Sequence, residues 1–211
     1  MKIGVPKEIK SQENRIGLTP ESVKILTSNG NEVMVENNGG FEAGFYNEQY
    51  KSAGAKIVDK AEDIFNDSEI IVKVKEPQSS EVKMIKENQI VFTYLHLAAA
   101  KELTKGLVDS KSVCIAYETV TDNNGRLPLL APMSAVAGRM SVQAGAHCLE
   151  KNQKGRGLLL GGAPGVDPGN VVILGGGVVG ENAAIIATGM KAKVHIVDKS
   201  EKRLNELSKK F

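Results

Sequence analysis

The chain has 211 residues, which is enough for one large or two small domains. Hydrophobic residues make up 41% and charged residues 25% of the chain, the ordinary balance of a soluble globular protein. The net charge is only +2 and no long basic block occurs, so nucleic acid is not an expected partner. No stretch approaches the roughly 18 apolar residues of a membrane helix. The N-terminus has no apolar signal-peptide run, and Cys114 and Cys148 have the isolated spacing of reduced, buried thiols. We therefore expect a cytoplasmic protein with no membrane partner.

Short apolar segments alternate with helical segments through the first part of the chain. Strands are predicted at residues 2–5, 32–35, 56–58, 69–74, 89–95 and 112–116. Helices are predicted at residues 21–28, 48–53, 61–66, 79–87 and 98–109, the first of them capped by Thr19 and begun by Pro20. This alternation predicts a parallel sheet with helices on both faces.

The longest helical segment follows, at residues 132–152, and its apolar residues run nearly all round. That pattern is typical of a helix buried between two bodies. A glycine-rich loop at residues 155–169 comes next. We therefore divide the chain into a substrate domain at 1–130, a connecting helix at 131–153, and the start of a dinucleotide-binding domain at 154–211.

The segment 170–198 has the order of parts that binds a dinucleotide: strand, glycine turn, helix, second strand and terminal acid. Gly175 permits the sharp turn, Gly177 permits close approach of a pyrophosphate, and Gly180 permits close packing of helix on strand. The start of the helix, with Val178 and Val179, offers unpaired N–H groups to phosphates. The competing interpretation is a glycine-rich turn in some other α/β protein.

Asp198 ends the second strand, where a carboxylate can accept hydrogen bonds from both ribose hydroxyls. Its charge would repel a 2′-phosphate and so favours NAD over NADP, although Lys199, Lys202 and Arg203 lie close by in sequence and weaken that inference. Only two strands and the beginning of a second helix are present. We therefore expect an α/β chain with two Rossmann-like parallel-sheet domains, of which the second is incomplete.

Three residues of the first domain follow predicted strands, where α/β sheets bind their ligands. Arg15 has the planar fork that binds a carboxylate in two places. Lys75 ends an apolar strand, and His96 ends the next one with a ring suited to proton transfer near neutral pH. The alternative interpretation is solvated loop charges and a capped histidine. Ser134 is a phosphate contact or a simple helix cap, and Glu118 is a single acid with no visible partner. No metal-ligand spacing occurs.

Several longer motifs carry a resemblance that is more specific than the glycine turn. They are GVPKEIKSQENRIGLTP (4–20), VKVKEP (72–77), YLHLA (94–98), AYETV (116–120), LPLLAPMS (127–134) and GGAPGV (161–166). Over essentially its whole length the chain resembles the alanine dehydrogenases, with the α subunit of proton-translocating transhydrogenase as a more distant relative. It resembles an N-terminal portion of these proteins.

The resemblance implies NAD-dependent, reversible oxidative deamination of L-alanine to pyruvate and ammonium. It implies that Arg15 and Lys75 hold the substrate, that His96 is the acid/base group, and that Ser134 and Asp198 contact NAD. Arg203 falls where the family often has a basic residue near the adenosine.

The same resemblance implies a homo-oligomer, a hexamer in the family. It also places a catalytic aspartate in a C-terminal part beyond residue 211, for which this chain has no candidate. A separately made C-terminal fragment could therefore be a partner. The alternatives are a transhydrogenase α-subunit-like protein, which His96 within LHLAA disfavours, and an inactive remnant.

Overall fold

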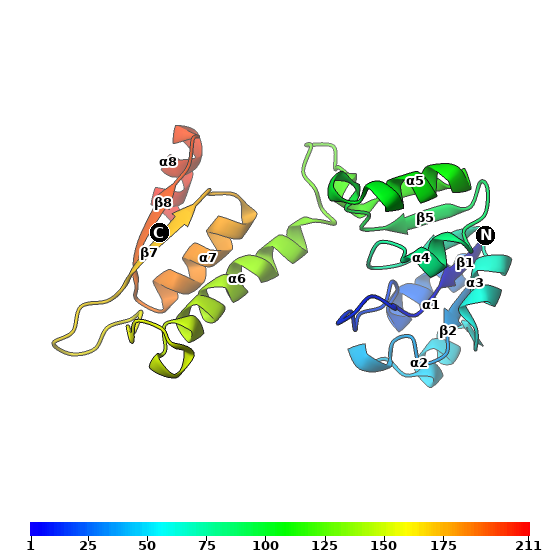
Figure 1. Ribbon diagram of the computed structural model, residues 1–211, viewed down its shortest axis with the longest axis horizontal. Coiled ribbons are helices and arrows are strands. Elements are labelled where there is room, and N and C mark those ends of the chain that lie inside the picture. The colour runs from blue at the N-terminus through cyan, green and yellow to red at the C-terminus, as the bar shows by residue number, and fades with distance from the viewer. The chain divides into compact units, whose positions relative to one another are not determined.

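The computed structural model describes all residues, Met1–Phe211. The chain forms two compact units, Met1–Gly125 and Arg126–Phe211 (Figure 1). None of the helices combines the length and the apolar character needed to cross a membrane.

The first unit is built on a six-stranded parallel sheet with the order β3-β2-β1-β4-β5-β6. The strands are β1 (Lys2–Val5), β2 (Glu32–Glu36), β3 (Lys56–Val58), β4 (Ile70–Val72), β5 (Ile90–Thr93) and β6 (Val113–Ala116). The helices are α1 (Pro20–Ser28), α2 (Asn47–Ser52), α3 (Ala61–Asp67), α4 (Ser79–Val82) and α5 (Lys101–Ser110). Short 3-10 turns lie at η1 (Phe41–Ala43), η2 (Leu97–Ala99) and η3 (Tyr117–Thr119). The predicted α/β class with a parallel sheet is confirmed.

Helices cover both faces of this sheet, because successive strand residues point to opposite sides. Ile3 and Val5 of β1 pack with Val23 of α1 and Tyr50 of α2 in one core. On the other face, a second core contains Ile64 and Phe65 of α3, Ile71 of β4, Val91 of β5 and Leu107 of α5. The sheet is therefore a central layer between two layers of helices.

Several elements are shorter than predicted. The helix expected at 79–87 ends at Val82, and the strand expected at 89–95 spans only Ile90–Thr93. Two further differences have a local reason. The strand expected at 69–74 pairs only from Ile70 to Val72, because the amides of Val74 and Lys75 donate to the side chain of Glu8 instead. The helix expected at 98–109 is split, since Ala100 has a backbone outside the helical region (φ −123°, ψ 66°).

The second unit has a two-stranded parallel sheet of β7 (Asn170–Leu174) and β8 (Lys193–Val197). Its helices are α6 (Ala131–Cys148), α7 (Val178–Gly189) and α8 (Glu201–Lys210), with a 3-10 turn at η4 (Lys151–Gln153). Figure 1 shows α6 running alongside α7, which its dense contacts with that helix support. One face of the sheet packs into an apolar core with α6 and α7. The other face exposes Val172, Leu174 and Val197 to solvent, with Leu174 83% exposed.

The expectation that the long helix is buried all round is wrong within its unit. Only Gly138 and Val142 of α6 are buried, whereas Val136 and Met140 are each 57% exposed. Gly138 lies so close to α7 that an added Cβ would sit 2.2 Å from the carbonyl oxygen of Val179. Cys148 is exposed, which also corrects its expected burial, and Cys114 is partly buried.

Candidate active site

The strand order brings the three candidate residues of the first unit to neighbouring strand ends. The chain runs outward from β1 through β2 to β3, and then returns to the other side of β1 with β4 and β5. The order therefore reverses between β1 and β4, which is where open α/β sheets bind ligands. Arg15 follows β1, Lys75 follows β4 and His96 follows β5, so all three lie beyond the carboxyl ends of adjacent central strands.

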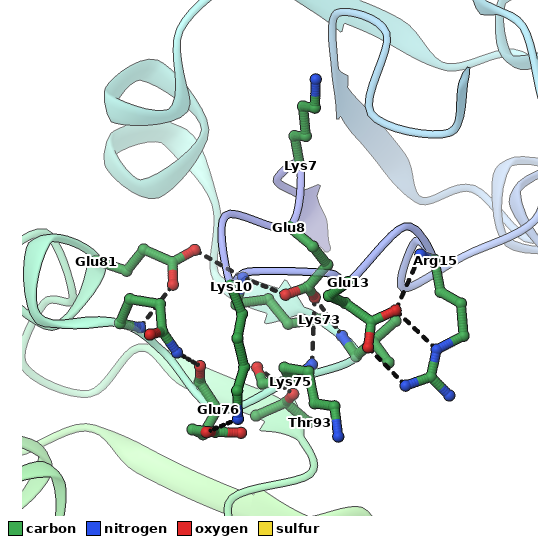
Figure 2. A network of polar contacts seen from close by, with 12 residues as sticks. Lys7, Glu8, Lys10, Glu13, Arg15, Lys73, Lys75, Glu76, Glu81 and Thr93 are labelled. Carbon is green, nitrogen blue, oxygen red and sulfur yellow. Dashed lines mark hydrogen bonds and ion pairs between the residues drawn. The ribbon is translucent and has the colours of Figure 1, made fainter. Parts of the chain in front are cut away.

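Arg15 is held by a carboxylate from its own loop. Its Nε and Nη2 donate to the two oxygens of Glu13 at 2.8 and 2.6 Å, as Figure 2 shows. Glu13 also accepts from the backbone N–H of Arg15 at 2.9 Å. The guanidinium lowers the pKa of Glu13, and the carboxylate raises that of Arg15. This ion pair leaves Nη1 outside it and fixes the plane of a guanidinium that is half exposed.

Lys75 lies three residues beyond β4 and is partly buried. Its backbone is fixed on both sides: the N–H donates to Glu8 at 3.3 Å, and the carbonyl accepts from the hydroxyl of Thr93 at 2.9 Å. Its ammonium makes no ion pair within 4 Å, and its positive charge lowers the pKa of nearby Glu13 after the larger effects of Arg15. Lys73, two residues earlier, is the fully buried lysine of this segment, and its ammonium pairs with two glutamates, Glu8 and Glu81.

His96 is exposed, with its backbone in the left-handed region at φ 50°. Glu118 holds this turn by accepting from the backbone N–H groups of Leu95 at 3.2 Å and His96 at 2.8 Å. Burial raises the pKa of Glu118, but these amides outweigh it and the net shift is downward. Tyr94 stacks beside the imidazole, with ring centroids 6.1 Å apart and planes 19° apart. The ring of His96 is thus placed over an aromatic neighbour at the solvent-facing edge of the sheet.

Arg15 and Glu118 also act electrostatically on Tyr94. The charge of Arg15 lowers the pKa of Tyr94, although burial of the phenol dominates and raises it overall. Glu118 raises the pKa of the same phenol. Tyr94 therefore lies within reach of Arg15 on one side and of the His96 turn on the other. A guanidinium and an imidazole on either side of one phenol, with the Lys75 ammonium close enough to Glu13 to lower its pKa, can bind a small anion and move a proton to or from it.

In the second unit the glycine turn has the geometry that its spacing predicts. Gly175 has φ 98°, which favours glycine. A Cβ on Gly180 would meet the carbonyl oxygen of Gly175 at 1.9 Å, so helix α7 packs against the turn only with glycine there. Gly177 caps α7 and faces open space, with nothing within 4 Å of an added Cβ. The first N–H groups of α7 are those of Val178, Val179 and Gly180, and they have no partner within the helix.

Asp198 and Arg203 both hold the middle of this turn. One oxygen of Asp198 accepts from the N–H of Gly176 at 2.7 Å and the other from Ser200 at 2.8 Å, and these bonds lower the pKa of the carboxyl. Arg203 donates its Nε to the carbonyl of Gly176 at 2.6 Å, and its terminal nitrogens pair with Glu181 and Glu206. Each of the three guanidinium nitrogens is therefore engaged by a protein group.

Ser134 belongs to the first turns of α6 and lines a cavity of about 710 Å³ in the same unit. The volume is that of an ordinary small-molecule site. The cavity runs along β7 and is also lined by the candidate cofactor residues Gly175, Gly177, Val178, Val179 and Gly180. The structure thus brings Ser134 and the glycine turn together, with Asp198 and Arg203 attached to that turn through Gly176.

Comparison with known proteins also gives two parts, but it divides them within α6 rather than after Gly125. Residues 4–137 match the model for "Alanine dehydrogenase/PNT, N-terminal domain", and residues 141–211 match that for the C-terminal domain. The chain belongs to the alanine dehydrogenase/PNT family. Over its full length it is 54% identical to an alanine dehydrogenase of Halomonas elongata and 53% identical to one of Methanococcus maripaludis. The chain spans 57% of the length of each of these relatives.

Solved structures agree with the family assignment. An L-alanine dehydrogenase superposes on the whole chain with a TM-score of 0.93 and 54% identity, and the chain covers 58% of it. A transhydrogenase of Sinorhizobium meliloti has a TM-score of 0.83 over 99% of this chain and 62% of its own, but only 22% identity. That second likeness shows a shared fold alone. The expected resemblance to an N-terminal portion of an alanine dehydrogenase is confirmed.

Within this alanine dehydrogenase/PNT chain, several acidic residues at the sheet edge were missed by sequence reasoning. Glu118 was visible only as a lone acid, because its partners Leu95 and His96 lie just beyond the end of the neighbouring strand β5. A signal was available, since β5 and β6 are consecutive parallel strands whose carboxyl ends must meet at one edge. Glu8 and Glu13 had no such signal of their own. Lys73, however, lies in an otherwise apolar strand, and a buried lysine needs a carboxylate partner.

Proposed function

We propose that this chain carries the substrate site and part of the nucleotide site of an NAD-dependent alanine dehydrogenase. The reaction is the reversible conversion of L-alanine, NAD⁺ and water to pyruvate, ammonium, NADH and a proton. One observation carries the proposal. Arg15, Lys75 and His96 follow three adjacent central strands at the point where the strand order reverses. The 54% identity to alanine dehydrogenases supports alanine over other small amino acids.

Each of the three residues has a separate task in this proposal. Arg15, with its guanidinium plane held by Glu13, binds the carboxylate of the substrate. Lys75 directs its ammonium, which has no ion-pair partner within the chain, at the carbonyl oxygen of pyruvate. Bound NAD would supply the acceptor for the hydride that leaves the α-carbon of alanine. His96 takes a proton from the water that adds to the resulting iminium, and returns a proton to the departing amine.

The second unit supplies the nucleotide contacts. The free N–H groups at the start of α7 receive the pyrophosphate, and Ser134 contacts the nucleotide from α6. Asp198 accepts from the adenosine ribose, and its negative charge favours NAD over NADP. Arg203 does not oppose this preference, because Glu181, Glu206 and the carbonyl of Gly176 occupy its guanidinium.

Binding of pyruvate to the 211-residue chain tests the substrate site without requiring turnover. We expect Arg15→Gln and Lys75→Gln to weaken pyruvate binding about 10- to 100-fold, as the loss of one charge-assisted contact does. Lys56→Gln, which removes an exposed lysine of β3, is the matched control and should bind as the wild type does. Titration followed by NMR or calorimetry measures all four proteins. Equal affinity in all of them contradicts the proposed roles.

Cofactor assays separate the competing functions. Alanine-dependent formation of NADH supports the dehydrogenase, whereas hydride exchange between NADH and an NADP analogue supports a transhydrogenase-like subunit. NADH binding that weakens in Asp198→Asn, with no turnover, supports a chain that binds ligands and needs a further polypeptide for catalysis. A folded chain that binds neither NADH nor pyruvate supports the inactive remnant.

A further inference from the structure

A buried cluster of three charged side chains lies behind the candidate substrate site (Figure 2). Lys73 is fully buried, and its ammonium donates to Glu8 at 3.1 Å and to Glu81 at 2.6 Å. Both carboxylates have only 2% of their side-chain surface exposed. Burial raises the pKa of Glu81, against the opposing effect of Lys73. Apolar residues of similar volume often stabilise a core as well as such a cluster does, so stability alone is a weak reason for keeping it.

Glu8 differs from Glu81 in what its second oxygen does. Oε1 of Glu8 accepts from the backbone N–H of Val74 at 2.6 Å and from that of Lys75 at 3.3 Å. These two N–H groups have no partner on a neighbouring strand, although the carbonyl of Val74 accepts from the N–H of Tyr94 at 3.3 Å. The Glu8 side chain accepts the hydrogen bonds that a neighbouring strand would otherwise accept from these amides. Glu8 belongs to the same loop as Arg15.

The same contacts tie the two substrate-binding loops together. Glu8 follows β1 by three residues, and the loop returns to β4 at Gly17, where an added Cβ would lie 2.5 Å from the carbonyl oxygen of Val72. The carbonyl of Lys75 is held from the other side by Thr93. The amides of Val74 and Lys75 are therefore fixed to the Arg15 loop through Glu8, while the next residue, Glu76, is tied to that loop by its ion pair with Lys10.

Glu81 offers a matched comparison because it shares the ammonium of Lys73 but does not touch Lys75. Its second oxygen accepts from the N–H of Gln78 at 2.7 Å and caps α4. Replacing either glutamate with glutamine removes one negative charge beside Lys73. Glutamine has one acceptor oxygen, so in each case it satisfies either the lysine or the backbone amides, not both.

We propose that Glu8 is a positioning residue for the substrate site. It holds the backbone of Lys75 so that this ammonium and the guanidinium of Arg15 bind the same 2-oxo acid. Glu8 itself does not touch the ligand. The inference rests on the proposed function, since it assigns a task to a residue behind that site.

The test compares wild type, Glu8→Gln and Glu81→Gln in the full 211-residue chain, with pyruvate as the probe. Three quantities are measured: pyruvate affinity, hydrogen exchange at the amides of Val74 and Lys75, and resistance to urea. We expect both variants to lose resistance to urea. Only Glu8→Gln should exchange faster at the two amides and bind pyruvate about 10-fold more weakly, because only there is the lysine misplaced.

The possible outcomes separate the two claims. A wild-type chain that binds no pyruvate overturns the proposed function, and this inference with it. Wild-type binding that is unchanged in Glu8→Gln, or reduced equally in Glu81→Gln, overturns the inference alone. If Glu8→Gln does not fold, Glu8→Asp retains the buried charge but shortens its reach by one methylene. It should show the same faster exchange and weaker binding, and wild-type behaviour in both measurements would overturn the inference.

Discussion

Carboxylates hold most of the backbone and side-chain positions at the edge of the first sheet. Glu13 fixes the plane of the Arg15 guanidinium, and Glu118 fixes the turn that carries His96. Glu76 pairs with Lys10, and Lys10 and the Glu76 backbone lower its pKa overall although burial raises it. Acidic residues look unfavourable at a site proposed to bind an anion, yet each one here is matched by a cation or by backbone N–H groups. They orient donors and leave the positive charge of Lys75 for the ligand.

The pair of Glu13 and Arg15 makes stability depend on pH in a definite direction. Because Arg15 lowers the pKa of Glu13 in the folded chain, the unfolded chain binds the proton more tightly. The pair therefore stabilises the fold above the ordinary pKa of glutamate, and this contribution is lost as the pH falls through the lowered value. We expect Glu13→Gln to reduce the free energy of unfolding by about 0.2–1 kcal/mol near neutral pH, as for a pair with one exposed partner.

Urea unfolding of wild type and Glu13→Gln over a series of pH values checks this expectation. The difference between the two proteins should shrink as the pH falls below the ordinary glutamate pKa of 4.5 and through the lowered pKa of Glu13, where the wild-type carboxylate becomes protonated. Other acids with lowered pKa values, such as Glu118, are present in both proteins and cancel in the difference. A gap that stays constant or widens toward acid pH contradicts the assignment.

At the scale of elements, helix α6 packs on α7 through glycine rather than through large apolar side chains. The core of the second unit is correspondingly made of small residues, with Ala183, Ala184 and Ala187 of α7 buried. Close approach of two helix backbones is possible only where no Cβ intervenes. Gly138 lies at such a point, whereas Gly145, two turns later in the same helix, faces open space.

These two glycines predict opposite effects of the same substitution. Gly138→Ala forces a methyl group against the backbone of α7 and should destabilise the second unit by about 1–3 kcal/mol. Gly145→Ala meets no atom within 4 Å and improves helix propensity, so it should stabilise by about 0.5–1 kcal/mol. Chemical unfolding followed by circular dichroism measures both. A loss of stability in Gly145→Ala as large as that in Gly138→Ala would refute the packing argument.

The elements and the cofactor motif could be predicted because their signals are local. The strands at Lys2–Val5 and Lys56–Val58 have the predicted bounds, since short apolar runs between turn residues mark them. The Glu8–Lys73 contact spans 65 residues and depends on β4 lying beside β1, and strand order leaves no trace in periodicity. The prediction that α6 is buried was wrong. The apolar residues around the helix can be read from the sequence, but the elements that would cover them cannot.

At the scale of the whole molecule, the two units differ in how much of their apolar surface is covered. The first has helices on both faces of six strands. The second has two strands, and Val172, Leu174 and Val197 are exposed on one face. Two strands bury little surface on their own. The hexamer implied by the family resemblance and a separate C-terminal fragment remain predictions.

This imbalance predicts that the second unit unfolds first. All four tyrosines, Tyr46, Tyr50, Tyr94 and Tyr117, lie in the first unit, and the chain has no tryptophan. Tyrosine fluorescence therefore reports on the first unit alone, whereas far-ultraviolet circular dichroism reports on both. In a urea titration we expect helical signal to fall before tyrosine fluorescence changes. Coincident curves, or fluorescence changing first, would show that the small unit is not the weaker one.

The left-handed backbone at His96 has a consequence for how this position can change. A non-glycine residue there costs about 1–2 kcal/mol, and glycine would relieve that cost. The chain thus has histidine at a position whose backbone conformation suits glycine better, and only histidine supplies the imidazole. Selection for heat tolerance alone would favour glycine at position 96 and would discard the group on which the proposed proton transfer depends. Thermal stability and the proposed proton transfer therefore favour different residues at position 96.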